Sequence, residues 1–284
     1  MSKIISVANQ KGGVGKTTTA INLAACLALS GQKVLIIDID PQGNASSGLG
    51  VNLRENQKGI YELLAGNASL DQVIYPTEID TLKIIPSNVD LAGAEIELVG
   101  RDHREKILSM ALNGVNAEYE FVVIDCPPSL GLLTLNALAV SQSVLIPMQC
   151  EYYALQGLSQ LLKTLKRIQK SINPDLKVEG ILLTMYDNRT LLNGQVENHV
   201  KKYFSEFLMK TIIPRNIRLS EAPSHGKPIV LYANRSKGSD SYVELAQEVI
   251  QRTKGEMVSP KTEPQEITYE EWIKENQLRD FLKK

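Results

Sequence analysis

Short runs of apolar, mostly β-branched residues alternate along this chain with longer segments whose apolar positions repeat every three or four residues. The short runs predict strands, and the longer segments predict helices. We expect strands over residues 3–8, 33–38, 82–86, 120–126, 143–148, 178–185 and 210–213. We expect helices over residues 16–30, 91–112, 131–139, 154–171, 192–207 and 240–253. This alternation is typical of an α/β domain with a doubly wound, mostly parallel sheet flanked by helices.

The first helix and the C-terminal linker can both be recognised in the sequence. The segment after Lys16 is apolar on nearly all sides, which predicts a buried first helix, and Gly31 is a suitable helix stop. Residues 254–265, KGEMVSPKTEPQ, have the proline and charge content of a linker. We therefore expect one domain over residues 1–254 and a linker with a C-terminal tail over residues 255–284, for which a helix is one option.

Composition narrows the class of protein. A chain of 284 residues with 43% apolar residues can bury one large core. It has no run of eighteen apolar residues, and its N-terminus reads as a strand, so we expect a cytoplasmic protein. The cysteines are Cys26, Cys126 and Cys150, and their spacing suggests neither disulfides nor a zinc site. We interpret them as reduced thiols in the core.

The stretch NQKGGVGKTTT, residues 9–19, lies between the first predicted strand and the first predicted helix. A glycine-rich loop that opens a helix presents free backbone N–H groups to an anion, and the helix dipole adds to the attraction. This pattern predicts a triphosphate site in which Lys16 contacts the β- and γ-phosphates and Thr17 binds Mg²⁺. The match to the usual motif is imperfect because Gln10 stands where its first glycine belongs, and Lys11 is a second lysine without an evident role.

Acidic residues end two of the predicted strands. Asp125 follows FVVI, from where its carboxylate can hold Mg²⁺ through a water molecule. Asp38 and Asp40 lie two residues apart in LIIDIDPQ and therefore on the same side of the chain. One of them could assist the metal while the other positions the attacking water, or one could accept hydrogen bonds from loop amides.

Several longer motifs carry a resemblance to a known family. They are KGGVGKTTT, LIIDIDPQGNASSGLG, IDCPPSLGLLTLNAL, QCEYYALQGLSQLL and IPRNIRLSEAPSHGKPI. Together they resemble the ParA/Soj family of chromosome and plasmid partitioning ATPases, within the deviant Walker A group of P-loop NTPases that also includes MinD and the nitrogenase iron protein. The resemblance covers Lys3 to about Ile250.

The resemblance implies a role for the second lysine. In the family the lysine that corresponds to Lys11 crosses the interface of an ATP-bound homodimer, and the one that corresponds to Lys16 serves its own subunit. Two tetra-anionic nucleotides buried face to face need the extra positive charge.

The same resemblance implies roles for the other motif residues. The loop that binds the nucleotide is Lys11, Gly12, Gly13, Val14, Gly15, Lys16, Thr17 and Thr18, and its catalytic residues are Lys11, Lys16 and Asp40. In the family, Thr17 and Asp125 belong to the Mg²⁺ site, with Asp38 behind them, and Asp40 positions the attacking water. The stretch from Pro214 to Asn216 resembles the segment that contacts adenine.

The segment between Tyr186 and Gly238 has an uneven charge. It holds nine Lys or Arg against four acids, in a chain whose net charge is −1. This asymmetry favours a local surface that binds polyanions, although a solvated surface of mixed charge would look similar. The resemblance implies nonspecific contacts with double-stranded DNA from Arg189, Arg215, Arg218, Lys227 and Arg235. Phosphate contacts should then dominate, with a nucleoid-associated location and a ParB-like partner that stimulates slow hydrolysis.

The tail, ITYEEWIKENQLRDFLKK, departs from the family pattern. Its apolar residues fall roughly on one helical face, but residues 268–284 carry four acids and four bases, unlike the basic helix that anionic lipid attracts. Docking on the domain or on a partner, a flexible tail and membrane contact remain the alternatives. A MinD-like membrane-cycling ATPase is the second functional hypothesis. An electron-transfer role is disfavoured because Cys126 and Cys150 form no recognisable cluster ligand set.

Overall fold

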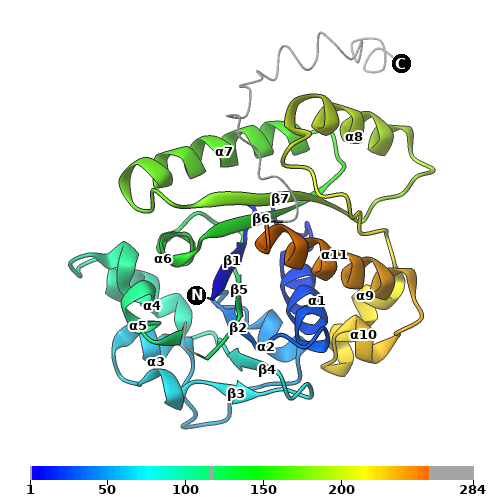
Figure 1. Cartoon of the computed structure of the whole chain (residues 1–284). Coiled ribbons are helices and arrows are strands. Elements are labelled where there is room, and N and C mark those ends of the chain that lie inside the picture. The colour runs from blue at the N-terminus through cyan, green and yellow to red at the C-terminus, as the bar shows by residue number, and fades with distance from the viewer. Residues whose placement is uncertain (1, 116–117, 256–284) are drawn as a thin grey trace.

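The computed structural model describes residues 2–115 and 118–255. Within these residues a seven-stranded sheet forms the centre of the molecule, in the order β3-β4-β2-β5-β1-β6-β7 (Figure 1). Every neighbouring pair is parallel except β3 and β4, which pair antiparallel. The predicted doubly wound, mostly parallel α/β fold is therefore confirmed.

The element bounds follow the predicted pattern closely in the core. The strands are β1 (Lys3–Val7), β2 (Val34–Asp38), β3 (Tyr75–Pro76), β4 (Leu82–Ile85), β5 (Phe121–Asp125), β6 (Ser143–Gln149) and β7 (Lys177–Thr184). The α-helices are α1 (Lys16–Leu29), α2 (Asn44–Gly48), α3 (Ile60–Ala65), α4 (Leu91–Leu98), α5 (Ile107–Ala111), α6 (Leu132–Val140), α7 (Ala154–Ser171), α8 (Leu191–Phe204), α9 (Ile217–Glu221), α10 (Ile229–Tyr232) and α11 (Lys237–Thr253). Short 3₁₀ helices are η1 (Leu70–Gln72), η2 (Arg104–Lys106) and η4 (Ala222–His225).

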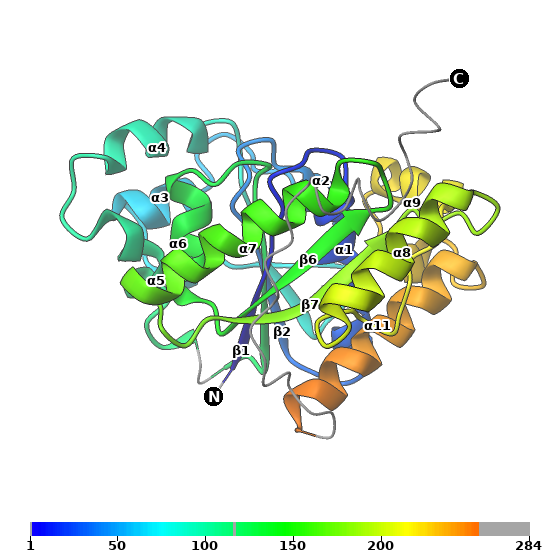
Figure 2. The same ribbon diagram turned by 90° about the horizontal axis from the view of Figure 1, so that it is seen from above.

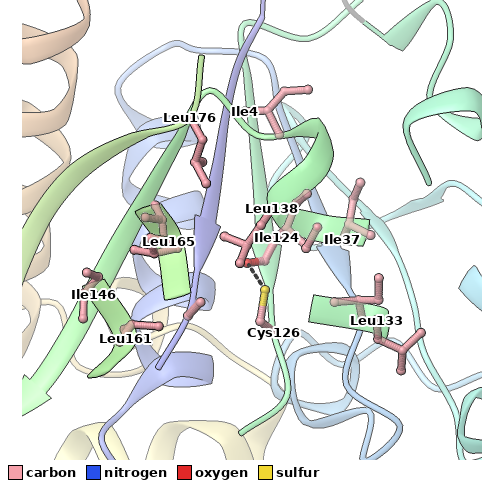
Figure 3. Packing of buried hydrophobic residues seen from close by; sticks show 14 of the residues in the cluster. Ile4, Ile37, Ile124, Cys126, Leu133, Leu138, Ile146, Leu161, Leu165 and Leu176 are labelled. Carbon is pink, nitrogen blue, oxygen red and sulfur yellow. Dashed lines mark hydrogen bonds between the residues drawn. The ribbon is translucent and has the colours of Figure 1, made fainter. Parts of the chain in front are cut away.

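The two faces of the sheet are covered by different helices. One core cluster joins the sheet to α6, α7 and α8, and a second joins it to α1 and α11. Figure 2 shows α7 and α8 lying above β6 and β7. Figure 3 shows side chains of the first cluster, where Ile4, Ile37 and Ile124 from neighbouring strands meet Leu133 and Leu138 of α6. Strands buried on both faces explain why their sequences are continuous apolar runs.

The helix predicted over residues 91–112 is wrong as a single element. The structure divides it into α4, η2 and α5, because the chain turns between Val99 and His103. Gly100 is a weak helix former, and His103 has a left-handed φ of 51°. Arg101 and Arg104 then donate to backbone carbonyls, which holds the turn. The apolar positions keep their helical spacing across this break, so the break could not be recognised from the sequence pattern.

The strand predicted over residues 210–213 is also wrong. This segment runs beside β7, where Ile213 N–H donates to Leu183 O at 2.9 Å, but it forms no ladder. The isolated bridges here involve Leu208 and Pro214, on either side of the segment. The carboxylate of Glu248 in α11 accepts hydrogen bonds from the backbone N–H groups of Lys210 and Thr211 at 2.9 and 3.0 Å. A side chain therefore satisfies the groups that a continuous strand pairing would have used.

The carboxyl ends of the parallel strands gather the acidic residues at one edge of the sheet. Asp38 of β2 is the register partner of Asp125 of β5, and Asp125 is that of Val7 of β1. The connections after the strands lead to opposite sides of β1, because the strand order changes direction there. In α/β proteins such a point leaves a crevice at the carboxyl ends of the strands, which is where ligands bind. α11 ends at Thr253. The predicted linker and tail lie outside the described residues from 256 onward.

Candidate nucleotide-binding and catalytic site

The loop between β1 and α1 has the conformation that its glycines allow. Gly13 and Gly15 have φ angles of +73° and +84°, which side chains with a Cβ adopt only at a cost. A Cβ placed on Gly12 or Gly13 would meet no atom within 4 Å. The outer side of the loop is thus open, and a phosphate can approach its backbone. Val14, by contrast, points into the protein and is 1% exposed.

Two hydrogen bonds fix this loop to the strands beneath it. Thr184 at the end of β7 donates from Oγ1 to Val14 O at 2.8 Å. Asn9 donates from Nδ2 to Pro147 O of β6 at 2.7 Å and accepts from Lys11 N–H at 3.1 Å. A loop held on both sides is pre-organised for its ligand. Sequence reasoning missed both residues, since Thr184 lies 170 positions from its partner.

Lys16 lies inside the loop. Its side chain is 7% exposed, and Nζ donates to Lys11 O at 2.9 Å. Burial lowers the pKa of Lys16, while the nearby Asp125 and Asp40 act in the opposite direction. Thr17 and Thr18 follow in the first turn of α1, where backbone N–H groups lack helical partners. The structure thus brings the lysine and the threonines to the helix end where an anion binds.

Asp125 is a fully buried carboxylate, and neither oxygen has a hydrogen bond of normal geometry. Burial raises its pKa well above the usual range, and the charge of Asp38 raises it further. Thr17 is close enough to act in the opposite direction. A buried, unpartnered carboxylate beside a hydroxyl fits a cation.

Asp38 holds the segment after β2 rather than facing open space. Its Oδ2 accepts from the backbone N–H and the hydroxyl of Ser46 at 2.9 and 2.7 Å, and Oδ1 accepts from Asp40 N–H at 3.2 Å. The hydroxyl of Ser46 in turn accepts from Ser87 N–H at 2.9 Å. Burial raises the pKa of Asp38 to about 6, and these hydrogen bonds oppose that shift.

Asp40 is positioned by this network. Its backbone is bound to Asp38, and its own Oδ1 accepts from Gln42 N–H at 3.0 Å. The side chain is 7% exposed and close enough to Lys16 to influence its pKa. Asp40 is therefore held at the edge of the loop, where a carboxylate can orient a water molecule.

In residues 2–115 and 118–255, no group of three or more His, Cys, Asp or Glu side chains could hold a metal ion by itself. Mg²⁺ at nucleotide sites usually takes one or two protein ligands and completes its shell with water and phosphate oxygens. The Thr17 hydroxyl and the unpartnered Asp125 carboxylate are a donor set of that kind.

Lys11 lies on the rim of the site and not within it. Its Nζ pairs with the carboxylate of Glu151, in the turn between β6 and α7, and both side chains are 43% exposed. An exposed pair of this kind is weak. Lys11 is therefore available to a charge that approaches from outside. The sequence offered no signal for Glu151, because 140 residues separate the two partners.

The predicted adenine segment reaches the same edge of the sheet. Pro214 bridges to Tyr186, just beyond β7, and Arg215 N–H donates to Tyr186 O at 3.0 Å. Asn216 caps α9 by accepting from Arg218 N–H at 2.8 Å. A Cβ placed on Gly15 would lie within 4 Å of Thr184 and Met185, and Thr184 donates to Val14 O, so the end of β7 connects this segment to the phosphate loop.

The predicted DNA contacts are distributed over several elements. Arg189 follows β7 and forms a two-pronged pair with Asp187, whose pKa falls to about 2 mainly through these hydrogen bonds. Arg215 also lies near Asp187. Arg218 pairs with Glu221 on α9. Two further residues, Lys227 and Arg235, lie beyond α9, and Lys227 pairs with Glu78 in the turn between β3 and β4.

Known proteins of similar sequence cover most of this chain. A family model described as "AAA domain" matches residues 2–178. The sporulation initiation inhibitor protein Soj of Bacillus subtilis is 57% identical over 249 residues, which cover 88% of this chain and 98% of that protein. The chromosome partitioning protein ParA of Myxococcus xanthus is 54% identical, with 89% of each chain covered.

Among solved structures, cobyrinic acid a,c-diamide synthase from Mycobacterium smegmatis with bound ADP and magnesium superposes with a TM-score of 0.80. It is 36% identical, with 93% of this chain and 100% of that chain covered. In the part of the chain that the structure describes, no helix is long and apolar enough to cross a membrane. With relatives at 57% and 54% identity that cover nearly nine tenths of it, the chain belongs to the ParA/Soj family of P-loop partitioning ATPases.

Proposed function

We propose that this protein is an ATP-driven partition switch, which dimerises with ATP and Mg²⁺, binds DNA nonspecifically as the dimer, and is released when a ParB-like partner stimulates hydrolysis. The observation that carries the proposal is the division of labour between two lysines in one loop. Lys16 is buried inside the loop, and Lys11 is half-exposed on its rim.

The chain's own groups have defined tasks in hydrolysis. Lys16 and the N–H groups at the start of α1 bind phosphate oxygens. Mg²⁺, when bound by Thr17 and Asp125, neutralises charge on the phosphates. Asp40 orients the attacking water, and Asp38 keeps Asp40 in place through its backbone N–H. No arginine of the motifs is placed as a finger in its own subunit, so hydrolysis in isolation should be slow.

Lys11 couples nucleotide binding to dimerisation in this proposal. Its carbonyl accepts from Lys16, but its ammonium group pairs with Glu151 on the exposed rim. When a second subunit approaches, Lys11 exchanges Glu151 for the partner's phosphates. A phosphate carries more charge than one carboxylate, so the exchange is favourable, and in this proposal it needs the γ-phosphate that ATP has and ADP lacks.

DNA binding rests on phosphate contacts. The candidates Arg189, Arg215 and Arg218 lie near the carboxyl edge of the sheet, and the first and third are held by acidic neighbours that a phosphate can replace. If each dimer neutralises about four to six phosphates, the logarithm of affinity should fall with the logarithm of salt with a slope of about −4 to −5.

A membrane-cycling function of MinD type is the alternative raised by the sequence. The relatives named above are a Soj protein and a chromosome partitioning protein ParA, at 57% and 54% identity. These names support partitioning over the membrane alternative, and we do not propose the latter.

Co-sedimentation tests the proposal. The protein is mixed with nonspecific duplex DNA or with anionic liposomes, each with ATP or ADP, and the Asp40→Ala variant is included to slow hydrolysis. Lys16→Ala is the control that cannot hold the phosphates. We expect ATP-dependent DNA binding that weakens steeply with salt. Binding to liposomes, or equal DNA binding with ADP, would contradict the proposal.

A further inference from the structure

The outer face of α7 carries exposed basic residues and no acidic ones. The 18 residues of α7 include four basic residues and no acid. Lys163, Arg167 and Lys170 are exposed, and their spacing of four and three residues aligns them along one side of the helix. The opposite side is buried in the core through its leucines and Ile168. We refer to these three residues as the basic stripe.

The three residues of the basic stripe have no acidic partner in the described part of the chain, whereas several other basic residues do. Among the described residues, Lys163, Arg167 and Lys170 form no ion pair. By contrast, Arg189 and Lys227 each pair with an acid of the described fold. The stripe spans seven residues, or about 10 Å of helix. An extended set of like charges with no counter-charge is suited to an acidic ligand.

The chain itself contains a segment of matching charge. Residues 263–275 read EPQEITYEEWIKE and carry five glutamates against one lysine. Glu263, Glu266 and Glu270 also span seven residues, as the basic stripe does. Apolar side chains at Ile267 and Trp272 are interspersed among them. We refer to residues 263–275 as the acidic segment.

The described fold ends at Gly255, and this position lets the acidic segment reach the basic stripe. Arg252, near the end of α11, donates from Nη1 to Glu179 O at 2.9 Å, so α11 ends beside the first residues of β7. The chain from α7 enters β7 at this same end, six residues after Ser171. Glu263 lies eight steps along the chain from Gly255, and eight steps can span roughly 26–29 Å when extended. α7 itself is about 27 Å long.

We propose that the acidic segment of the same chain binds along the basic stripe of α7. The acidic segment has the opposite charge to the basic stripe, its glutamates span the same seven residues, and its connection to the fold is short. These three features favour the acidic segment over a nucleic acid as the occupant of the stripe. While it is bound, the segment closes the stripe to other polyanions. This inference goes beyond the partition switch and does not depend on it.

Trp272 makes the test direct, because it is the one tryptophan of the chain and lies within the acidic segment. Its emission and its quenching by acrylamide are measured on the full chain at low salt, without nucleotide or DNA. The isolated peptide 263–284 gives the value for an unbound tryptophan. We expect a blue-shifted, protected Trp272 in the full chain. Protection should fade in 1 M salt, where the screening length shortens to about 3 Å.

Charge reversal identifies the surface. The triple variant Lys163→Glu, Arg167→Glu, Lys170→Glu should lower the ratio of bound to free segment by roughly tenfold or more, since three exposed pairs are lost and replaced by repulsion. The control reverses three exposed basic residues on other elements, Arg54, Lys106 and Lys237, and should leave the quenching unchanged.

A second set of variants leaves α7 intact and guards against misfolding. Glu263→Lys, Glu266→Lys and Glu270→Lys together should also free Trp272, and combining both triple variants should restore its protection. The proposal is overturned if the wild-type tryptophan is as accessible as in the peptide, or if stripe reversal leaves it protected. The latter would point instead to the pocket near Tyr119 and Ile250. Protection that rises with protein concentration would overturn it too, since the segment would then bind a second copy.

Discussion

Replacing Glu151 by glutamine removes the charge that Lys11 contacts while keeping the shape of the side chain. We predict that this variant dimerises more tightly with ATP, because Lys11 no longer has to leave an ion pair before it reaches the partner's phosphates. The pair is present in the single subunit, where both side chains are 43% exposed. Its loss should hardly change the stability of the monomer.

The size of the effect follows from that exposure. An exposed pair of this kind stabilises by about 0.2–1 kcal/mol. A dimer releases two such pairs, so the gain is about 0.4–2 kcal/mol, and the dimer dissociation constant should fall by about 2- to 30-fold. The effect should shrink with rising salt, because the pair is screened.

Sedimentation velocity with ATP, in the Asp40→Ala background, measures the dissociation constant over a range of protein concentrations. Glu55→Gln is the matched control, since it removes an exposed glutamate far along the chain from this loop. A weaker or unchanged dimer in Glu151→Gln would refute the reasoning. A weaker dimer would mean that Glu151 contributes to the dimer itself, and an unchanged dimer would mean that it does not restrain Lys11.

Three further predictions follow from the site and the fold. Asp125→Asn should raise the free energy of unfolding of the nucleotide-free protein by about 1–3 kcal/mol, because it removes a buried unpartnered charge; the variant should also lose the rise in Tm that Mg²⁺ adds to ATP. The Asp38 carboxyl has a folded pKa of about 6, above its unfolded value, so the folded state binds the extra proton and the stability from this group falls as pH rises through 6. Urea unfolding of wild type relative to Asp38→Asn should therefore show a loss of about 1 kcal/mol between pH 5 and pH 7, and a constant difference would contradict the assignment. Gly226→Ala should destabilise by about 1–3 kcal/mol, since its φ is +62° and its Cβ would lie 2.9 Å from Gly50 Cα; Gly194→Ala, in open space on α8, should stabilise by up to about 1 kcal/mol in the same melts.

Local signals made the nucleotide loop predictable from the sequence. The order strand, glycine loop, lysine and helix is contiguous between Lys3 and Leu29, so it could be read without tertiary information. The acidic strand ends were predictable for the same reason. Parallel strands place their carboxyl ends at one edge, which brought Asp38 and Asp125 together. The roles of these residues in catalysis stay predictions that the experiments above test.

Other features depended on contacts between distant parts of the chain. The 210–213 segment is held by Glu248, up to 38 residues away in the sequence, and Lys11 pairs with Glu151, 140 residues away. No local pattern marks such pairs. The break between α4 and α5 left the apolar periodicity intact, so the break at Gly100 could not be seen in it. The basic stripe was visible in the sequence of α7, but its lack of partners became evident only from the folded arrangement.

ATP-dependent dimerisation of Lys11→Ala tests the central claim most directly. In the Asp40→Ala background, ATP binding is measured by fluorescent-nucleotide titration and association by sedimentation velocity on the same samples. We predict that Lys11→Ala binds ATP nearly as well as the parent but remains a monomer, because Lys16 alone serves its own subunit. A variant that dimerises like the parent, or one that no longer binds ATP, would contradict the role of Lys11 across the interface.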